Sequence, residues 1–130
     1  MDNGVNADEL NRQKLTPLHQ ACRKQGTLES IQILIDYGAD IKRADQDLWT
    51  PLHYAAYEGN YEASEKLITL RVDINALNRY NWTPLHLALK QGNIRVVSLL
   101  LKNPSIQIKD TILQDLSIQL GFYFLFDLFL

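Results

Sequence analysis

One tetrapeptide, Thr-Pro-Leu-His, occurs three times along this chain of 130 residues. The copies begin at Thr16, Thr50 and Thr83, so they are spaced 34 and then 33 residues apart. A repeat period of roughly 20–50 residues is typical of stacked structural units, because one such unit cannot bury its apolar face alone. We therefore expect three similar units in succession.

Each unit is predicted to contain two short helices joined by a turn. The Thr side chain can cap the first free N–H groups of a helix, and Pro at the first helical position loses no hydrogen bond. The first helix of each unit should therefore begin at the Thr-Pro pair. It should end near a glycine, because glycine readily adopts the left-handed conformation that closes a helix. These glycines are Gly26, Gly59 and Gly92.

The second helix of each unit is predicted from an apolar run after the glycine. In the first unit, Leu28, Ile31, Leu34 and Ile35 recur at helical spacing and are expected to form one buried face. The corresponding residues of the second unit are Tyr61, Ala63, Leu67, Ile68 and Leu70. Those of the third unit are Ile94, Val96, Val97, Leu99, Leu100 and Leu101.

A period of 33 with Thr-Pro-Leu-His-x-Ala, a short Ala-rich helix, Gly and a second apolar helix resembles the ankyrin repeat. The likeness covers about residues 11–110. It implies an all-α fold, an α-solenoid of stacked antiparallel helix pairs joined by β-hairpin-like loops. We predict repeats over about 11–44, 45–77 and 78–110, after an N-terminal extension or cap over 1–10.

The projecting loops implied by the resemblance lie at residues 45–49 and 78–82. The family usually has Gly two residues before the Thr, whereas this chain has Lys14, Leu48 and Asn81. Of these residue types, only Asn tolerates a positive φ comfortably. We therefore expect the loop tips to be strained or reshaped.

Protein binding through the loops and first helices is the activity that the resemblance implies. Trp, Tyr and Arg, the residue types that dominate interface hot spots, are frequent at these positions. The candidate partner-binding residues are Arg12, Gln13, Arg23, Lys24, Gln46, Asp47, Trp49, Tyr57, Glu58, Arg79, Tyr80, Trp82, Lys90 and Gln91. Tyr54 is a secondary candidate. As an alternative, Trp49 and Trp82 pack against neighbouring loops and stiffen the hairpins.

The repeated motif itself is expected to serve the scaffold. Its residues are Thr16, Pro17, Leu18, His19, Thr50, Pro51, Leu52, His53, Thr83, Pro84, Leu85 and His86. Each His is expected to form a hydrogen bond near its own Thr-Pro turn or with the adjoining loop. Neighbouring helices pack roughly 10 Å apart, whereas a zinc–nitrogen bond is about 2.0 Å long, so the three equivalent histidines cannot share a metal ion.

Catalysis has no motif in this sequence. There is no Gly-rich phosphate loop, no His-Glu-x-x-His helix and no Gly-x-Ser-x-Gly elbow, so we expect neither an enzyme nor a cofactor. Cys22 is the only cysteine, and it is expected to be a buried, unreactive thiol. The net charge of −2 gives no basic excess for nucleic-acid binding.

The compartment is predicted from two features. A single cysteine excludes an intrachain disulfide, and the polar, acidic N-terminus lacks the pattern of a secretory signal. Both features favour the cytoplasm or the nucleus.

Residues 111–130 depart from the repeat pattern and contain all four phenylalanines. We predict a degenerate fourth repeat or a hydrophobic C-terminal cap. The apolar stretch is interrupted by Asp127 and is about half the roughly 20 residues that a membrane span requires. Three alternatives remain for this segment: docking on the third repeat, self-association, or the end of a chain inside a longer array.

The function predicted from these features is that of a protein–protein interaction module, such as an adaptor or inhibitor, which binds a partner on its concave face. The alternative is a structural spacer or a fragment of a larger ankyrin-like protein whose activity lies elsewhere.

Overall fold

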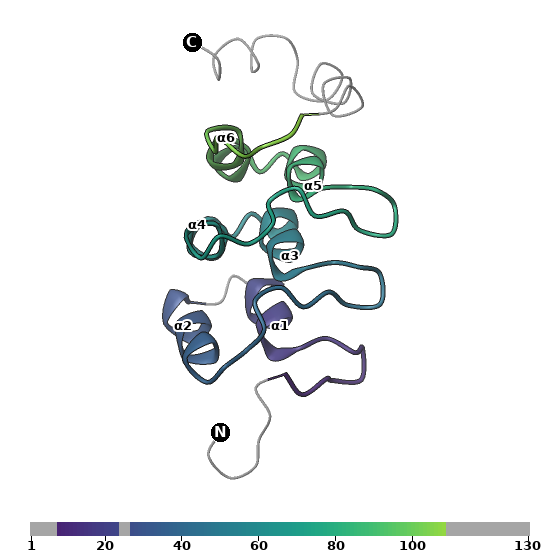
Figure 1. Ribbon diagram of the computed structural model, residues 1–130, viewed down its shortest axis with the longest axis vertical. Coiled ribbons are helices and arrows are strands. Elements are labelled where there is room, and N and C mark those ends of the chain that lie inside the picture. The colour runs from purple at the N-terminus through teal and green to yellow at the C-terminus, as the bar shows by residue number, and fades with distance from the viewer. Residues whose placement is uncertain (1–7, 24–26, 109–130) are drawn as a thin grey trace.

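The computed structural model describes residues 8–23 and 27–108, and these form six α-helices and no strand. The helices are α1 (Pro17–Arg23), α2 (Leu28–Asp36), α3 (Pro51–Glu58), α4 (Tyr61–Thr69), α5 (Pro84–Gln91) and α6 (Ile94–Leu101). In Figure 1, α1, α3 and α5 stack in one column and α2, α4 and α6 in a second. The predicted all-α solenoid is confirmed.

The first helix of each unit begins at its Thr-Pro pair, as predicted. Thr50 and Thr83 lie in the extended conformation just before α3 and α5, and the Oγ1 atom of each accepts a hydrogen bond from the backbone N–H of the motif His. Thr16 makes the same bond to His19, at 3.2 Å. Such a cap contributes about 1 kcal/mol to helix stability.

Glycine closes α3 and α5. Gly59 and Gly92 adopt left-handed conformations with φ of 72° and 71°, which confirms the predicted helix ends in the second and third units. Gly26 lies outside the described residues.

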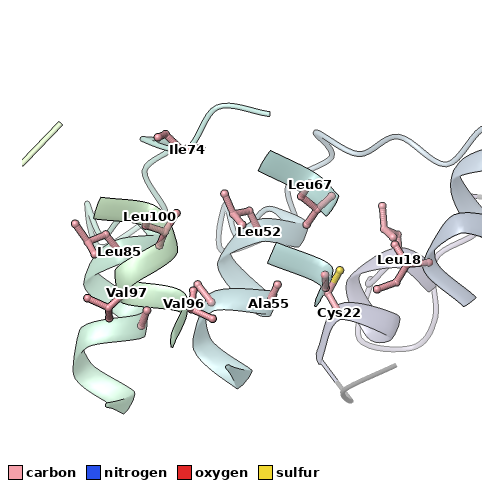
Figure 2. Close-up of a cluster of buried hydrophobic side chains, with 14 of the residues drawn as sticks. Leu18, Cys22, Leu52, Ala55, Leu67, Ile74, Leu85, Val96, Val97 and Leu100 are labelled. Carbon is pink, nitrogen blue, oxygen red and sulfur yellow. The ribbon is translucent and has the colours of Figure 1, made fainter. Parts of the chain in front are cut away.

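The core lies between the two columns and is built from equivalent residues of successive units. The motif residues Leu18, Leu52 and Leu85 are almost fully buried, and they pack with second-helix residues such as Leu67 and Leu100 (Figure 2). Burying a leucine side chain stabilises a fold by about 1.5–3 kcal/mol. The Thr-Pro-Leu-His motif therefore supplies one large apolar side chain to the core in every unit.

The predicted apolar face of the second helices is buried only in part. Ile31 and Leu34 are buried, but Leu28 is 46% exposed and Ile94 is 51% exposed, contrary to the prediction for these two residues. Both are the first residue of their helix, directly after the turn from the first helix. Periodicity alone extended the buried face too far toward the N-terminus, because it carries no information about where the neighbouring helix ends.

Three loops project from the same edge of the solenoid, on the side of α1, α3 and α5 (Figure 1). Their tips contain Lys14, Leu48 and Asn81 with φ of 60°, 62° and 61°. The backbone therefore keeps the left-handed conformation at positions where the family usually has Gly. This conformation costs about 1–2 kcal/mol at Lys14 and Leu48, where the expected strain is confirmed, whereas Asn81 adopts it more readily.

An Asn or Asp side chain holds each loop in this shape. The Asp45 Oδ1 atom accepts hydrogen bonds from the N–H groups of Asp47 and Trp49, both at 2.9 Å. Asn11 and Asn78 make the same pair of bonds in the first and third loops. Sequence reasoning missed this position, although Asn or Asp stands five residues before the motif Thr in every unit.

No helix in the described part of the chain is long and apolar enough to cross a membrane. The predicted segment over 111–130 lies outside the described residues, and the repeat boundaries drawn from the sequence stay predictions.

Candidate protein-binding surface

A groove of about 420 Å³ opens on the loop side of the solenoid. It lies between the first two loops, at the end of α1 and along α3, and the third loop contributes one residue. The lining residues are Gln13, Leu15, Arg23, Asp45, Gln46, Asp47, Trp49, Tyr54, Tyr57, Glu58 and Tyr80. We refer to these residues as the loop groove.

Trp49 is the centre of an aromatic cluster in the loop groove. Its ring centroid lies 4.9 Å from that of Tyr54 and 5.4 Å from that of Tyr57. The indole is only half-buried, so it packs within its own unit and also lines the groove. From the sequence, Trp49 was expected either to pack against its neighbours or to contact a partner. In the structure it packs on neighbouring rings and still lies at the surface.

Tyr54 and Asp45 form a polar pair at the base of this cluster. The Tyr54 hydroxyl donates a hydrogen bond to Asp45 Oδ2, while the other carboxylate oxygen holds the loop. Burial raises the pKa of Tyr54 above its ordinary value, and the bond to Asp45 raises it further. Tyr54 therefore stays a neutral donor, and Asp45 is a lining residue that the sequence did not predict.

Arg79 fixes the third loop against the second. Its backbone N–H donates to the Asp47 carbonyl at 2.9 Å, and its guanidinium donates to the Gln46 carbonyl. The Arg79 Nε atom also lies 3.5 Å from Asp47 Oδ1, with both side chains more than half exposed. An exposed ion pair contributes only about 0–1 kcal/mol, so the backbone bond is the more reliable link between the loops.

The third unit has an aromatic cluster of which only Tyr80 lines the loop groove. The Trp82 ring stacks on His86 at 5.1 Å between centroids and lies 5.5 Å from Tyr80. The Lys90 Nζ atom stands over Trp82, 4.5 Å from the ring centroid, in cation–π geometry. Trp82 therefore already has a cation of its own chain on one face.

The structure brings together only some of the candidate partner-binding residues. Eight of them line the loop groove: Gln13, Arg23, Gln46, Asp47, Trp49, Tyr57, Glu58 and Tyr80. Five do not line it: Arg12, Arg79, Trp82, Lys90 and Gln91. Lys24 lies outside the described residues. Partner binding by these residues stays a prediction.

Two of the motif histidines, His19 and His53, brace the loops, as expected from the sequence. The Thr16 N–H donates to His19 Nδ1 at 3.1 Å, so His19 Nε2 must carry the proton that it donates to the Arg43 carbonyl at 2.7 Å. His53 makes the same bonds, from the Thr50 N–H and to the Trp82 carbonyl. Burial lowers the pKa of both imidazoles, which are therefore neutral near pH 7.

Metal and thiol chemistry find no support in the described residues. They contain no group of three His, Cys, Asp or Glu side chains placed to hold a metal ion. Cys22 is buried as predicted, and burial raises the pKa of its thiol to about 12. The thiolate, which is the reactive form, is therefore scarce at neutral pH.

Comparison with known proteins adds a family relationship. A family model described as ankyrin repeats in three copies matches residues 1–78 and 49–112. The chain is 42% identical over 55 residues to protein phosphatase 1 regulatory subunit 27 of Mus musculus, a match that covers 42% of this chain and 35% of that protein. It is 40% identical over 55 residues to the Notch-regulated ankyrin repeat-containing protein of Xenopus tropicalis, covering 42% and 47%. The matched segment thus spans about a third to a half of these relatives.

Proposed function

The chain belongs to the ankyrin repeat family, whose repeats generally mediate protein–protein interaction, and we propose that it binds a protein partner through the loop groove. One observation carries the proposal. Four aromatic side chains from two repeats, Trp49, Tyr54, Tyr57 and Tyr80, line the same concave surface. Tyr and Trp bury large rigid areas and keep a polar group for hydrogen bonding, which suits them to interface cores.

The exposed rings give this surface its binding potential. Tyr80 is 63% exposed and Tyr57 is 38% exposed, so a partner that covers them removes apolar area from water. Tyr57 lies on α3, and the second and third loops, which carry Trp49 and Tyr80, are already fixed by Asp45, Asn78 and Arg79. Binding therefore requires little further ordering of the backbone, which favours affinity.

The remaining candidates extend the proposed surface along the loop side. Arg79 and Trp82 belong to the third loop, Lys90 and Gln91 to the end of α5, and Arg12 to the first loop. Lys24 is retained on its sequence position alone. The proposal involves no catalysis, and it places the protein in the cytoplasm or nucleus because its only cysteine is a free thiol.

The identity of the partner is left open by the relatives. One is named for regulation of protein phosphatase 1 and the other for regulation by Notch, and these names share no binding partner. Repeat solenoids of one fold serve unrelated targets, so the partner must be found by experiment.

Affinity purification with the complete chain tests the proposal. We expect the variant Tyr57→Ala/Tyr80→Ala to lose at least about tenfold of the specifically captured partner, which corresponds to about 1.4 kcal/mol of binding free energy. Trp49 and Trp82 are left in place because they also pack on Tyr54 and His86, contacts that the double variant retains. The matched control is Tyr37→Ala, which removes a 48% exposed ring at the end of α2.

Equal capture by the folded double variant and by the unaltered chain contradicts the proposed surface. Absence of any specifically captured protein favours the alternative in which the repeats act as a structural spacer within a larger protein. Circular dichroism and thermal melting of each variant separate loss of binding from loss of folding.

A further inference from the structure

The second and third units differ at one pair of equivalent positions. In the third unit, Lys90 follows Trp82 by eight residues and places its ammonium 4.5 Å from the ring centroid. In the second unit, Tyr57 holds the position of Lys90 and meets Trp49 edge-on, with centroids 5.4 Å apart. The third unit thus supplies a cation to its own tryptophan, whereas the second supplies a ring.

The charge of the loop groove is unbalanced. Asp45, Asp47 and Glu58 contribute three carboxylates to its lining, and Arg23 contributes one guanidinium. Arg23 donates to Gln13 Oε1 at 3.4 Å and so is tied to the first loop. Arg79 partly offsets Asp47 from outside the groove, at an ion-pair distance of 3.5 Å. The faces of the aromatic rings add further negative potential.

We propose that the loop groove receives a Lys or Arg side chain from an extended basic segment of the protein partner. The cation packs beside Trp49 and Tyr57, much as the Lys90 ammonium packs over Trp82, within reach of the carboxylates. This inference rests on the proposed function and specifies the chemistry of its partner. An acidic segment is repelled by the same carboxylates, and a purely apolar one removes them from water without supplying a compensating charge.

The test uses the complete chain and a displayed library of random linear decapeptides as the probe. We expect the enriched peptides to share a Lys or Arg at one aligned position. Replacing that residue in a synthetic peptide with a neutral analogue, citrulline for Arg or norleucine for Lys, is expected to weaken binding at least tenfold. Binding is also expected to weaken between low salt and 0.5 M NaCl. The distance over which exposed charges attract each other falls from about 10 Å at 0.1 M salt to about 3 Å at 1 M.

The substitution Tyr57→Lys gives the second unit the lysine that the third unit carries. We expect it to occupy the site from within and to weaken binding of the same peptides at least tenfold, with circular dichroism unchanged. Tyr37→Lys is the matched control, because it makes the same change at the residue that follows α2 and is expected to leave binding unaltered. Glu58→Gln, which keeps the side-chain shape, is expected to weaken binding about threefold and provides a second variant if Tyr57→Lys does not fold.

Other outcomes overturn the inference and distinguish it from the proposed function. Enriched peptides without Lys or Arg, whose binding is lost in Tyr57→Ala/Tyr80→Ala, overturn the basic partner and leave the binding surface in place. Peptides that bind both Tyr57 variants as well as the unaltered chain overturn both proposals. Failure to enrich any peptide also overturns the inference that a separate partner supplies a basic segment. The same holds if this chain forms a dimer that Tyr57→Lys converts to monomers.

Discussion

His19 and His53 each join two loops of the solenoid through one imidazole ring. Because a backbone N–H donates to Nδ1, the single proton of the neutral ring must lie on Nε2, where it is donated to a carbonyl of a later loop. A protonated ring carries a hydrogen on both nitrogens, so it loses the bond at Nδ1. Each of these two imidazoles must therefore be neutral to keep both of its hydrogen bonds.

The free energy of unfolding is expected to fall as the pH drops below about 6.5, the ordinary pKa of an exposed His. Burial lowers the pKa of His19 and His53 in the folded chain, so between the folded and unfolded pKa values the unfolded chain binds more protons. The full stability is present above the unfolded pKa and is lost as the pH falls toward the folded pKa. Each unit of lowering costs about 1.4 kcal/mol per His.

Urea unfolding at pH 7.5, 6.5 and 5.5, followed by circular dichroism, measures this loss. His53→Gln is expected to be less stable at pH 7.5 but to show a smaller decrease between pH 7.5 and 5.5. A free energy of unfolding that stays constant or rises over this range contradicts the role assigned to the buried imidazoles.

At the scale of the helices and loops, close packing between neighbouring units decides which substitutions are tolerated. Asn93, between α5 and α6, donates its side-chain amide to the carbonyls of Ala56 and Tyr57 at the end of α3, both at 2.8 Å. Its amide group therefore lies beside Gly59, and a Cβ atom at Gly59 would stand 2.8 Å from Asn93 Oδ1. The glycine provides a turn and also a contact between repeats.

Gly59→Ala and Gly92→Ala form a matched pair for this contact. Both sites have nearly the same positive φ, 72° and 71°, so both substitutions incur the left-handed penalty of about 1–2 kcal/mol. Only Gly59 has a close neighbour, since nothing lies within 4 Å of a Cβ atom at Gly92. We expect urea unfolding to show Gly59→Ala as less stable than Gly92→Ala by about 1–3 kcal/mol. Equal losses contradict the account of the Asn93 contact.

Local chemistry explains why the helices could be predicted and the loop supports could not. Thr-Pro begins a helix through bonds within a few residues, and this information is present in the sequence. The role of Asp45 depends on the folded loop, in which Leu48 is left-handed and the N–H groups of Asp47 and Trp49 both reach the carboxylate. Asp45 alone gives no indication of this role. The role becomes visible only when the three loops are compared and Asn or Asp is found at the same position in each.

At the scale of the whole molecule, stacking decides which candidates share a surface. The sequence placed Trp49 and Trp82 at the same repeat position, yet Trp49 lines the loop groove and Trp82 does not. Their surroundings differ because Tyr57 and Lys90, at equivalent positions, meet the two rings differently. A repeat period identifies equivalent residues, but the side chains of neighbouring units determine their environment.

Amide hydrogen exchange of the complete chain, free and bound to the captured partner, tests the central claim most directly. If the loop groove is the binding surface, exchange slows on binding in segments 45–49, 54–58 and 78–82, while α2 exchanges as in the free protein. Slowed exchange confined to α2, α4 and α6, with the three loop-side segments unchanged, would contradict the claim that this protein binds through its loop groove.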